Sequence, residues 1–72
     1  MNLKNRCMNE KVYKNVLDTI AKSIVEYDFS DVPADDTDEA CYNLAKNLYH
    51  ADDEEARTIV DIIMKKYVHL IN

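Results

Sequence analysis

The chain has 72 residues, of which 14 are acidic and nine are basic, so its formal net charge is −5 at pH 7. A domain of this size has a small core, which rarely supplies more than about 3–5 kcal/mol of stability unaided. No segment has the length of an apolar membrane span, no charged start leads into an apolar signal run, and the two cysteines do not form a disulfide framework. We therefore expect one soluble domain, spanning residues 1–72, in a reducing cytoplasm.

Glycine is absent and proline occurs once, at Pro33. Tight hairpin turns use glycine at positive φ, so the composition is unfavourable for a β protein and favourable for helices. Three amphipathic segments with short connections predict an all-α fold, a small antiparallel three-helix bundle.

The first helix is expected over residues 9–28, after a short basic lead at 1–8. Asn9 is a suitable N-cap, because its side-chain oxygen can accept a bond from a free backbone N–H. A row of alternating charge, four residues apart, is expected on the solvent side of the helix: Lys14, Asp18, Lys22 and Glu26. The buried stripe is expected to consist of Val12, Tyr13, Val16, Leu17, Ile20, Ile24 and Tyr27.

The first connection, residues 29–36, contains Pro33, which prevents the helix from continuing. Phe29 and Val32 are apolar residues in this polar segment, and we expect them to tuck under it against one end of the core. The second helix is expected over residues 37–50, with Asp36 and Glu39 at the spacing of a capping box. Its narrow stripe comprises Ala40, Cys41, Leu44, Leu48 and Ala51.

The third helix is expected over residues 53–70, where Asp52 and Glu55 again have capping-box spacing. This segment has the strongest helical periodicity in the chain. Its apolar arc is wide, and a small core can leave its margin uncovered, which suggests a second possibility of self-association or partner binding. That margin consists of Ile62, Val68, Met64 and Tyr49, and the stripe itself of Ala56, Ile59, Val60, Ile63, Tyr67, Leu70 and Ile71.

Charge is strongly segregated along the chain. Residues 26–55 hold eleven of the 14 acidic side chains and a single basic one, Lys46, for a formal charge of −10, while the remaining residues carry +5. The acids form two groups, one before the second helix and one before the third. Carboxylates at a helix start are favoured by the helix dipole, but one or two suffice, and a larger number repel one another. The excess suggests a negative surface that docks on a basic partner.

Other chemistries have less support. The run at residues 35–39 lacks the glycine and ligand spacing of an EF-hand, and His50 has no second histidine or cysteine at zinc-site spacing. Cys7 or Cys41 with His50 or His69 makes a weak nucleophile and base pair. A third hypothesis, a small DNA-binding regulator, uses the basic residues of the N-terminal region, although net acidity and a second helix with one lysine are unfavourable for it. These basic residues are Lys4, Arg6, Lys11 and Lys14.

The sequence thus predicts a non-catalytic protein-binding module with no metal, cofactor, direct nucleic-acid or membrane partner. The first hypothesis is a small phage or mobile-element inhibitor, of anti-CRISPR or anti-restriction type. Its acidic surface would block a basic, nucleic-acid-handling surface in the host cytoplasm. The alternative is a helical adaptor or homodimer that uses the apolar margin. The expected partner-binding residues are Asp35, Asp36, Asp38, Glu39, Asp52, Asp53, Glu54 and Glu55, with Tyr42 and Tyr49 as aromatic anchors.

Overall fold

The computed structural model describes residues 9–71, and the basic lead at 1–8, with Cys7, lies outside this range. The described chain is an all-α three-helix bundle, as predicted. Its helical segments are α1 (Glu10–Ile24), η2 (Ala34–Asp36), α2 (Thr37–Tyr49), α3 (Asp53–Ile62), η3 (Ile63–Tyr67) and η4 (Val68–Leu70).

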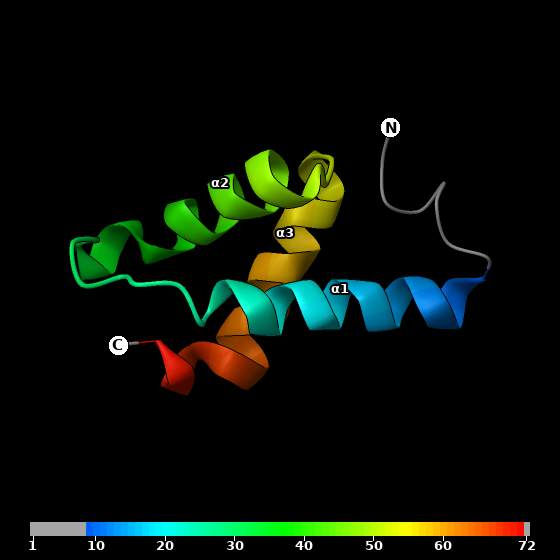
Figure 1. Ribbon diagram of the computed structural model, residues 1–72, viewed down its shortest axis with the longest axis horizontal. Helices are drawn as coiled ribbons and strands as arrows, with labels where there is room; N and C mark the ends of the chain where they lie inside the picture. Colours follow the sequence, from blue (N-terminus) through cyan, green and yellow to red (C-terminus); the bar gives the residue numbers. More distant parts are fainter. Residues whose placement is uncertain (1–8, 72) are drawn as a thin grey trace.

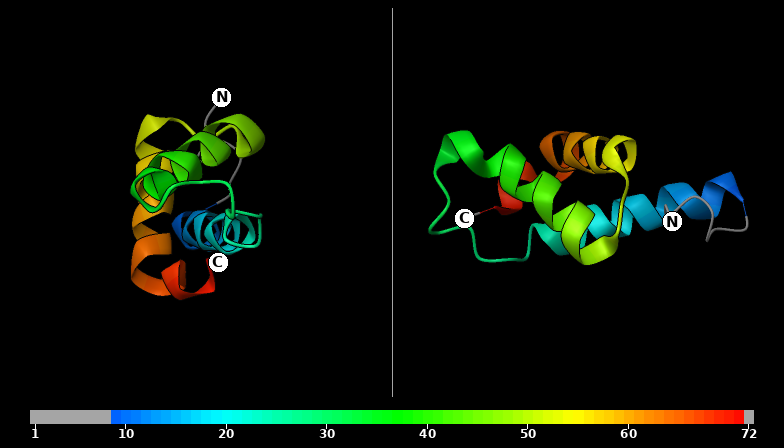
Figure 2. Two further views of the ribbon diagram at one scale, coloured as in Figure 1. Left: turned by 90° about the vertical axis from the view of Figure 1, so that its left-hand side faces the viewer. Right: turned by 90° about the horizontal axis from the view of Figure 1, so that it is seen from above.

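The helices α1 and α2 run in opposite directions, and α3 crosses behind both of them (Figure 1). Viewed from the end, α3 stands on one side of the layer that α1 and α2 form (Figure 2). Every pair of these three helices is in contact, so the core lies where all three meet. Within residues 9–71, no helix is both long enough and apolar enough to span a membrane.

The helix α1 begins where the sequence predicts and ends earlier. Asn9 has extended backbone geometry, and its side-chain oxygen accepts a hydrogen bond from the Val12 N–H at 2.9 Å. The regular helix ends at Ile24, not at the expected Asp28, and the backbone bonds then tighten to three-residue spacing. This tighter turn lets the chain leave the helix axis while Val25 and Phe29 stay buried.

The core is made of small and branched apolar side chains from all three helices. Phe29 is buried under the first connection and Val32 packs against the core, as expected. Leu48 was expected in the buried stripe of α2 but is 48% exposed, because Ala45 occupies the centre of the contact. The core cluster comprises Leu17, Ile20, Ala21, Ile24, Val25, Phe29, Cys41, Ala45, Ala51, Ala56, Ile59 and Ile63.

The third helical segment reaches Leu70 as predicted, but it is a regular α-helix only to Ile62. A π turn, Ile63–Tyr67, and a 3-10 turn, Val68–Leu70, complete it. A π turn adds a residue to the turn and rotates the residues that follow it around the helix. The apolar stripe predicted from a constant 3.6-residue period is therefore out of phase beyond this turn. Leu70, expected to be buried, is 45% exposed as a result.

Candidate partner-binding surface

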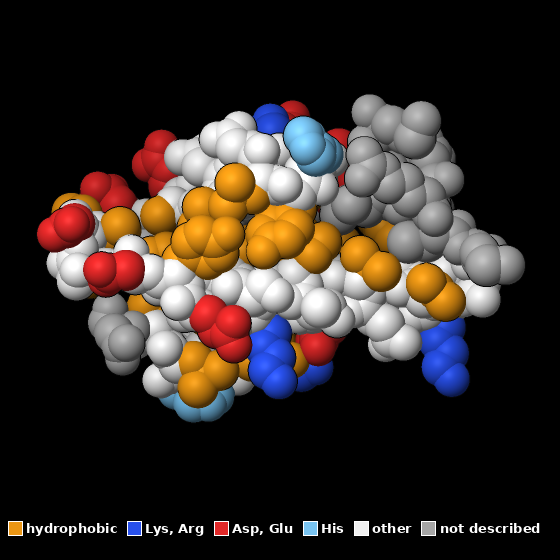
Figure 3. Space-filling model, viewed as in Figure 1, with side chains coloured by type: hydrophobic (Ala, Val, Ile, Leu, Met, Phe, Trp, Pro, Cys, Tyr) orange, Lys and Arg blue, Asp and Glu red, His pale blue; other side chains and the backbone are white. Residues whose placement is uncertain are grey.

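The first acidic group forms one exposed region at the end of the molecule where α1 stops and α2 starts. We call it the acidic edge, and all seven of its side chains are exposed. No lysine or arginine occurs between Lys22 and Lys46, and within residues 9–71 none of the seven takes part in an ion pair. Acidic side chains gather over this end in the space-filling view (Figure 3). The acidic edge comprises Glu26, Asp28, Asp31, Asp35, Asp36, Asp38 and Glu39.

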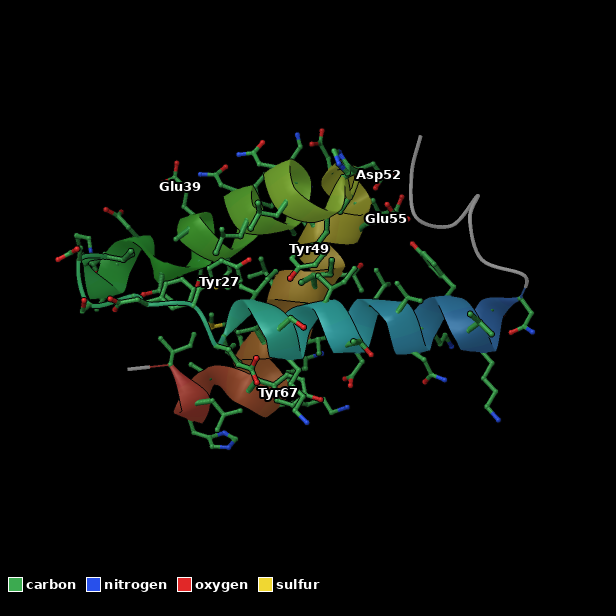
Figure 4. The ribbon with its side chains drawn as sticks, viewed as in Figure 1. Tyr27, Glu39, Tyr49, Asp52, Glu55 and Tyr67 are labelled. Atoms are coloured by element: carbon green, nitrogen blue, oxygen red, sulfur yellow. The ribbon has the colours of Figure 1, made fainter. Side chains whose placement is uncertain are left out.

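Local structure holds the acidic edge in place. Asp28 accepts a bond from the Ser30 N–H at 2.9 Å, and this bond lowers the pKa of the Asp28 carboxyl. The η2 turn bonds Asp36 N–H to the Pro33 carbonyl at 2.9 Å and carries Asp35 and Asp36 into the start of α2. The predicted capping box at Asp36 and Glu39 is wrong, because the Asp36 side chain makes no cap bond. Glu39 instead points outward from α2 (Figure 4).

The acidic edge continues into a groove between α2 and α3. This α2–α3 groove has a volume of about 420 Å³, and Asp38 and Glu39 belong to both features. Asp61 adds a third carboxylate, against a single cation, Arg57. Tyr42 and Val60 supply its apolar lining. A long cationic side chain suits such a site, because its methylene stem can lie on the apolar lining while its charge meets a carboxylate.

The second acidic group, Asp52–Glu55, is arranged differently. Asp52 and Glu55 form the predicted capping box: Glu55 N–H donates to Asp52 Oδ1 at 2.8 Å, and Asp52 N–H donates to Glu55 Oε1 at 3.0 Å. The Glu55 side chain is 3% exposed, and the Tyr13 hydroxyl donates to its Oε2 at 2.8 Å. Figure 4 shows Glu55 turned toward α1. Of this group, Glu54 is exposed and makes none of these bonds.

Asp53 joins α2 to α3. Its Oδ1 accepts hydrogen bonds from the Lys46 ammonium and, at 2.8 Å, from the Tyr42 hydroxyl. The bond from Lys46, and then that from Tyr42, lowers the pKa of the Asp53 carboxyl. The pKa of Lys46 is raised in turn by Asp53. The one lysine within the acidic segment thus pairs with the second acidic group and not with the acidic edge.

The two tyrosines expected as anchors have different neighbours. Tyr42 faces α3 and lines the groove. Tyr49 lies between α2 and α1 beside Tyr27 (Figure 4). Burial, and then the neighbouring Tyr27, raises the pKa of Tyr49. The structure therefore brings Tyr42 together with Asp38 and Glu39, and places Tyr49 elsewhere.

Three groove residues were not among the sequence-based candidates: Arg57, Val60 and Asp61. A weak signal for them exists, since Asp38 and Tyr42, like Arg57 and Asp61, are four residues apart and each pair shares one helix side. Only the packing of α2 on α3 turns these two rows into the walls of one groove.

The residues considered for catalysis and metal binding have other surroundings. Cys41 is fully buried, and burial, followed by the charge of Asp38, raises the pKa of its thiol to about 11. His50 is the C-cap residue of α2: its backbone is left-handed, with φ 60°, and its N–H donates to the Ala45 carbonyl. Within residues 9–71, no three His, Cys, Asp or Glu side chains converge as a metal site would need.

The apolar margin is only partly exposed. Val68 is 45% exposed, while Ile62, Met64 and Tyr49 are half-buried against the core.

Comparison with protein-family models, with curated proteins and with solved structures finds no match to this chain. Function is therefore inferred from the described residues alone.

Proposed function

We propose that this chain is a non-catalytic protein-binding module that docks a basic surface of its partner on the acidic edge and the α2–α3 groove. The supporting observation is that an exposed acidic edge, with no ion pair within residues 9–71, shares two carboxylates with a groove that has an apolar lining. Asp38 and Glu39 lie at the junction, and Tyr42 is the aromatic contact inside it.

The partner chemistry follows from the charges. Lysine and arginine surfaces that bind phosphates accept carboxylates through the same charge-assisted hydrogen bonds. The finer proposal is that the partner handles nucleic acid and that this chain blocks it. Such a block requires only a negative surface and no catalysis. It suits a small inhibitor of CRISPR or restriction systems that is encoded by a phage or mobile element and acts in the host cytoplasm. In this proposal Asp52, Asp53 and Glu55 mainly hold the fold, and the acidic edge makes the contact.

The test compares two variants with the same change in net charge. Asp38→Lys/Glu39→Lys, the junction variant, reverses the charge of the two residues shared by the acidic edge and the groove. Glu10→Lys/Glu54→Lys, the control, reverses the charge of two exposed acids elsewhere. Partners are captured from a host lysate, identified by mass spectrometry, purified, and titrated at several salt concentrations. We expect the junction variant to lose about tenfold or more in affinity, the control to lose little, and wild-type affinity to fall with added salt. A captured nucleic-acid-binding protein should also release its nucleic acid when this chain is added.

The second candidate is a helical adaptor or homodimer that uses the apolar end of the third helical segment. The observation in its favour is the exposure of Val68 and Leu70, each 45%. Val68→Asp should abolish binding in this case, and salt should matter little. Equal binding by both charge variants, with no salt dependence, would overturn the acidic-edge proposal and favour this one.

A further inference from the structure

The broad face formed by α1 and α2 carries an apolar band on the side away from α3. Val12, Tyr27 and Leu48 are 40%, 45% and 48% exposed. Hydrophobic side chains run across the middle of this face in Figure 3. Beside α1, a shallow hollow of about 250 Å³ is lined by Val12, Asn15, Val16, Thr19 and Ile20. An apolar band of this kind marks an interaction surface.

Leu48 lies on the side of α2 that faces away from α3. Tyr42 and Lys46 face α3, because both donate to Asp53. Leu48 lies about 160° around α2 from Lys46 at 3.6 residues per turn, and so points away from α3. The band and the α2–α3 groove are therefore on different sides of α2.

The charges at the two ends of this face are opposite. The beginning of α1 carries Glu10, Lys11 and Lys14, a net charge of +1, whereas Lys22, Glu26 and Asp28, at and just beyond its end, carry a net charge of −1. Figure 3 shows a lysine or arginine at the end where α1 begins and acids at the other end. A surface with this pattern is complementary to itself when one copy is reversed.

We propose that a second copy of this chain covers the band, with its α1 antiparallel to the first. A two-fold axis perpendicular to α1, near Thr19 and Ile20, places Val12 of one copy against Tyr27 of the other. The same register places Lys11 beside the other copy's turn at Glu26 and Asp28. One symmetric arrangement therefore satisfies both the apolar and the charged residues, as an isologous interface requires.

The size of the face makes this a weak dimer. The molecule measures 36 × 21 × 15 Å, so the broad face fits within a rectangle of roughly 750 Å², and the dimer covers only part of it. Stable interfaces bury about 800 Å² per partner. The dimer pairs two acidic-edge residues, Glu26 and Asp28, with Lys11. It leaves the other five acidic-edge residues and both α2–α3 grooves open, so two copies of a basic partner, or one partner with two basic sites, gain from bivalent binding. The dimer itself does not depend on the proposed function.

The oligomeric state is measured by analytical ultracentrifugation of the full chain over a range of concentrations, with circular dichroism to show that each variant is folded. We expect wild type to dimerise reversibly and Val12→Asp to be monomeric. Val68→Asp is the matched control, because Val68 has similar exposure at the end of the third helical segment. A wild type that is monomeric throughout, or a dimer lost in Val68→Asp and kept in Val12→Asp, overturns the proposal.

Charge reversal tests the register. Lys11→Glu and Glu26→Lys should each weaken self-association by roughly three- to tenfold, because each puts like charges together at two symmetric places. Mixing the two variants should restore a heterodimer, in which one set of contacts pairs Glu with Lys and the other retains the original pair. If the mixture associates no better than either variant alone, the antiparallel register is wrong.

Discussion

Glu55 is the one acidic side chain that is buried within the described part of the chain, and its contacts show how a carboxyl group is accommodated there. The Asp52 N–H and the Tyr13 hydroxyl donate to its two oxygens. A buried polar group is costly unless it is hydrogen-bonded, so both donors stabilise the buried position of this side chain. Burial, and then the bond to Glu55, raises the pKa of the Tyr13 hydroxyl, so that it stays protonated well into alkaline solution.

Replacement of Tyr13 by phenylalanine removes the hydroxyl donor and leaves the ring. We expect the free energy of unfolding to fall by about 1–3 kcal/mol, because a buried acceptor loses a hydrogen bond. Urea unfolding at neutral pH measures this, and Tyr42→Phe, which removes a hydroxyl bonded to the exposed Asp53, is the control, with an expected loss of less than about 1 kcal/mol. Equal stability of Tyr13→Phe and wild type would show that Glu55 does not need this bond.

At the scale of the helices, two identical sequence signals have different outcomes. Asp52 before α3 has extended geometry, φ −79° and ψ 178°, and caps the helix. Asp36 before α2 has φ −102° and ψ 2° and makes no side-chain cap bond. The η2 turn explains the difference: the chain is already winding helically there, and its N–H groups have carbonyl partners such as that of Pro33. An aspartate caps only where the backbone before the helix is extended.

Asp52→Ala and Asp36→Ala therefore form a matched pair. We expect Asp52→Ala to lower the free energy of unfolding by about 1 kcal/mol and Asp36→Ala to change it by less than about 0.5 kcal/mol. Thermal or urea unfolding of both variants provides the measurement. A comparable loss in Asp36→Ala would mean that its side chain caps α2 in solution.

The end of α2 offers a stabilising change. His50 has φ 60°, a conformation that glycine adopts without the steric cost of a side chain, and its N–H donates to the Ala45 carbonyl. His50→Gly should raise the free energy of unfolding by about 0.5–1 kcal/mol. His69→Gly, inside the η4 turn, should not be stabilising, so a gain in both variants would argue against the backbone explanation.

At the scale of the whole molecule, Asp18 fastens the end of the third helical segment to α1. The Lys66 ammonium donates to its Oδ1 at 2.9 Å and the Tyr67 hydroxyl to its Oδ2 at 2.7 Å. The row of charges on α1 was expected to face solvent, and for Asp18 this is wrong, because its side chain is 35% exposed and reaches across to another element. The bond from Lys66, and then that from Tyr67, lowers the pKa of the Asp18 carboxyl.

This lowered pKa gives a pH dependence with a definite sign. Since the folded-state pKa of Asp18 lies below its unfolded value, its stabilisation is present above about pH 4 and is lost as the pH falls through the folded-state pKa. Asp18→Asn should have a lower free energy of unfolding than wild type at pH 7. Between pH 7 and pH 3 this free energy should fall less in Asp18→Asn than in wild type, as measured by urea unfolding. In Asp31→Asn, in the exposed connection, the free energy of unfolding should fall on acidification by as much as it does in wild type. If acidification lowers the free energy of unfolding of Asp18→Asn as much as that of wild type, other carboxylates are responsible for the pH dependence.

The sequence by itself determined the all-α class, the break at Pro33, the caps at Asn9 and Asp52, and the segregation of charge, because each depends on residues a few positions apart. Only the tertiary structure decided which carboxylates stay on the surface and which hold the fold. Asp52, Asp53 and Glu55 bond within the chain, and the acidic edge does not pair with a cation within residues 9–71. The separation of Tyr42 from Tyr49, the exposure of Leu48 and the contact of Asp18 with Tyr67 depend on how helices cross. These positions are set by packing between residues distant in the chain, which no local pattern encodes.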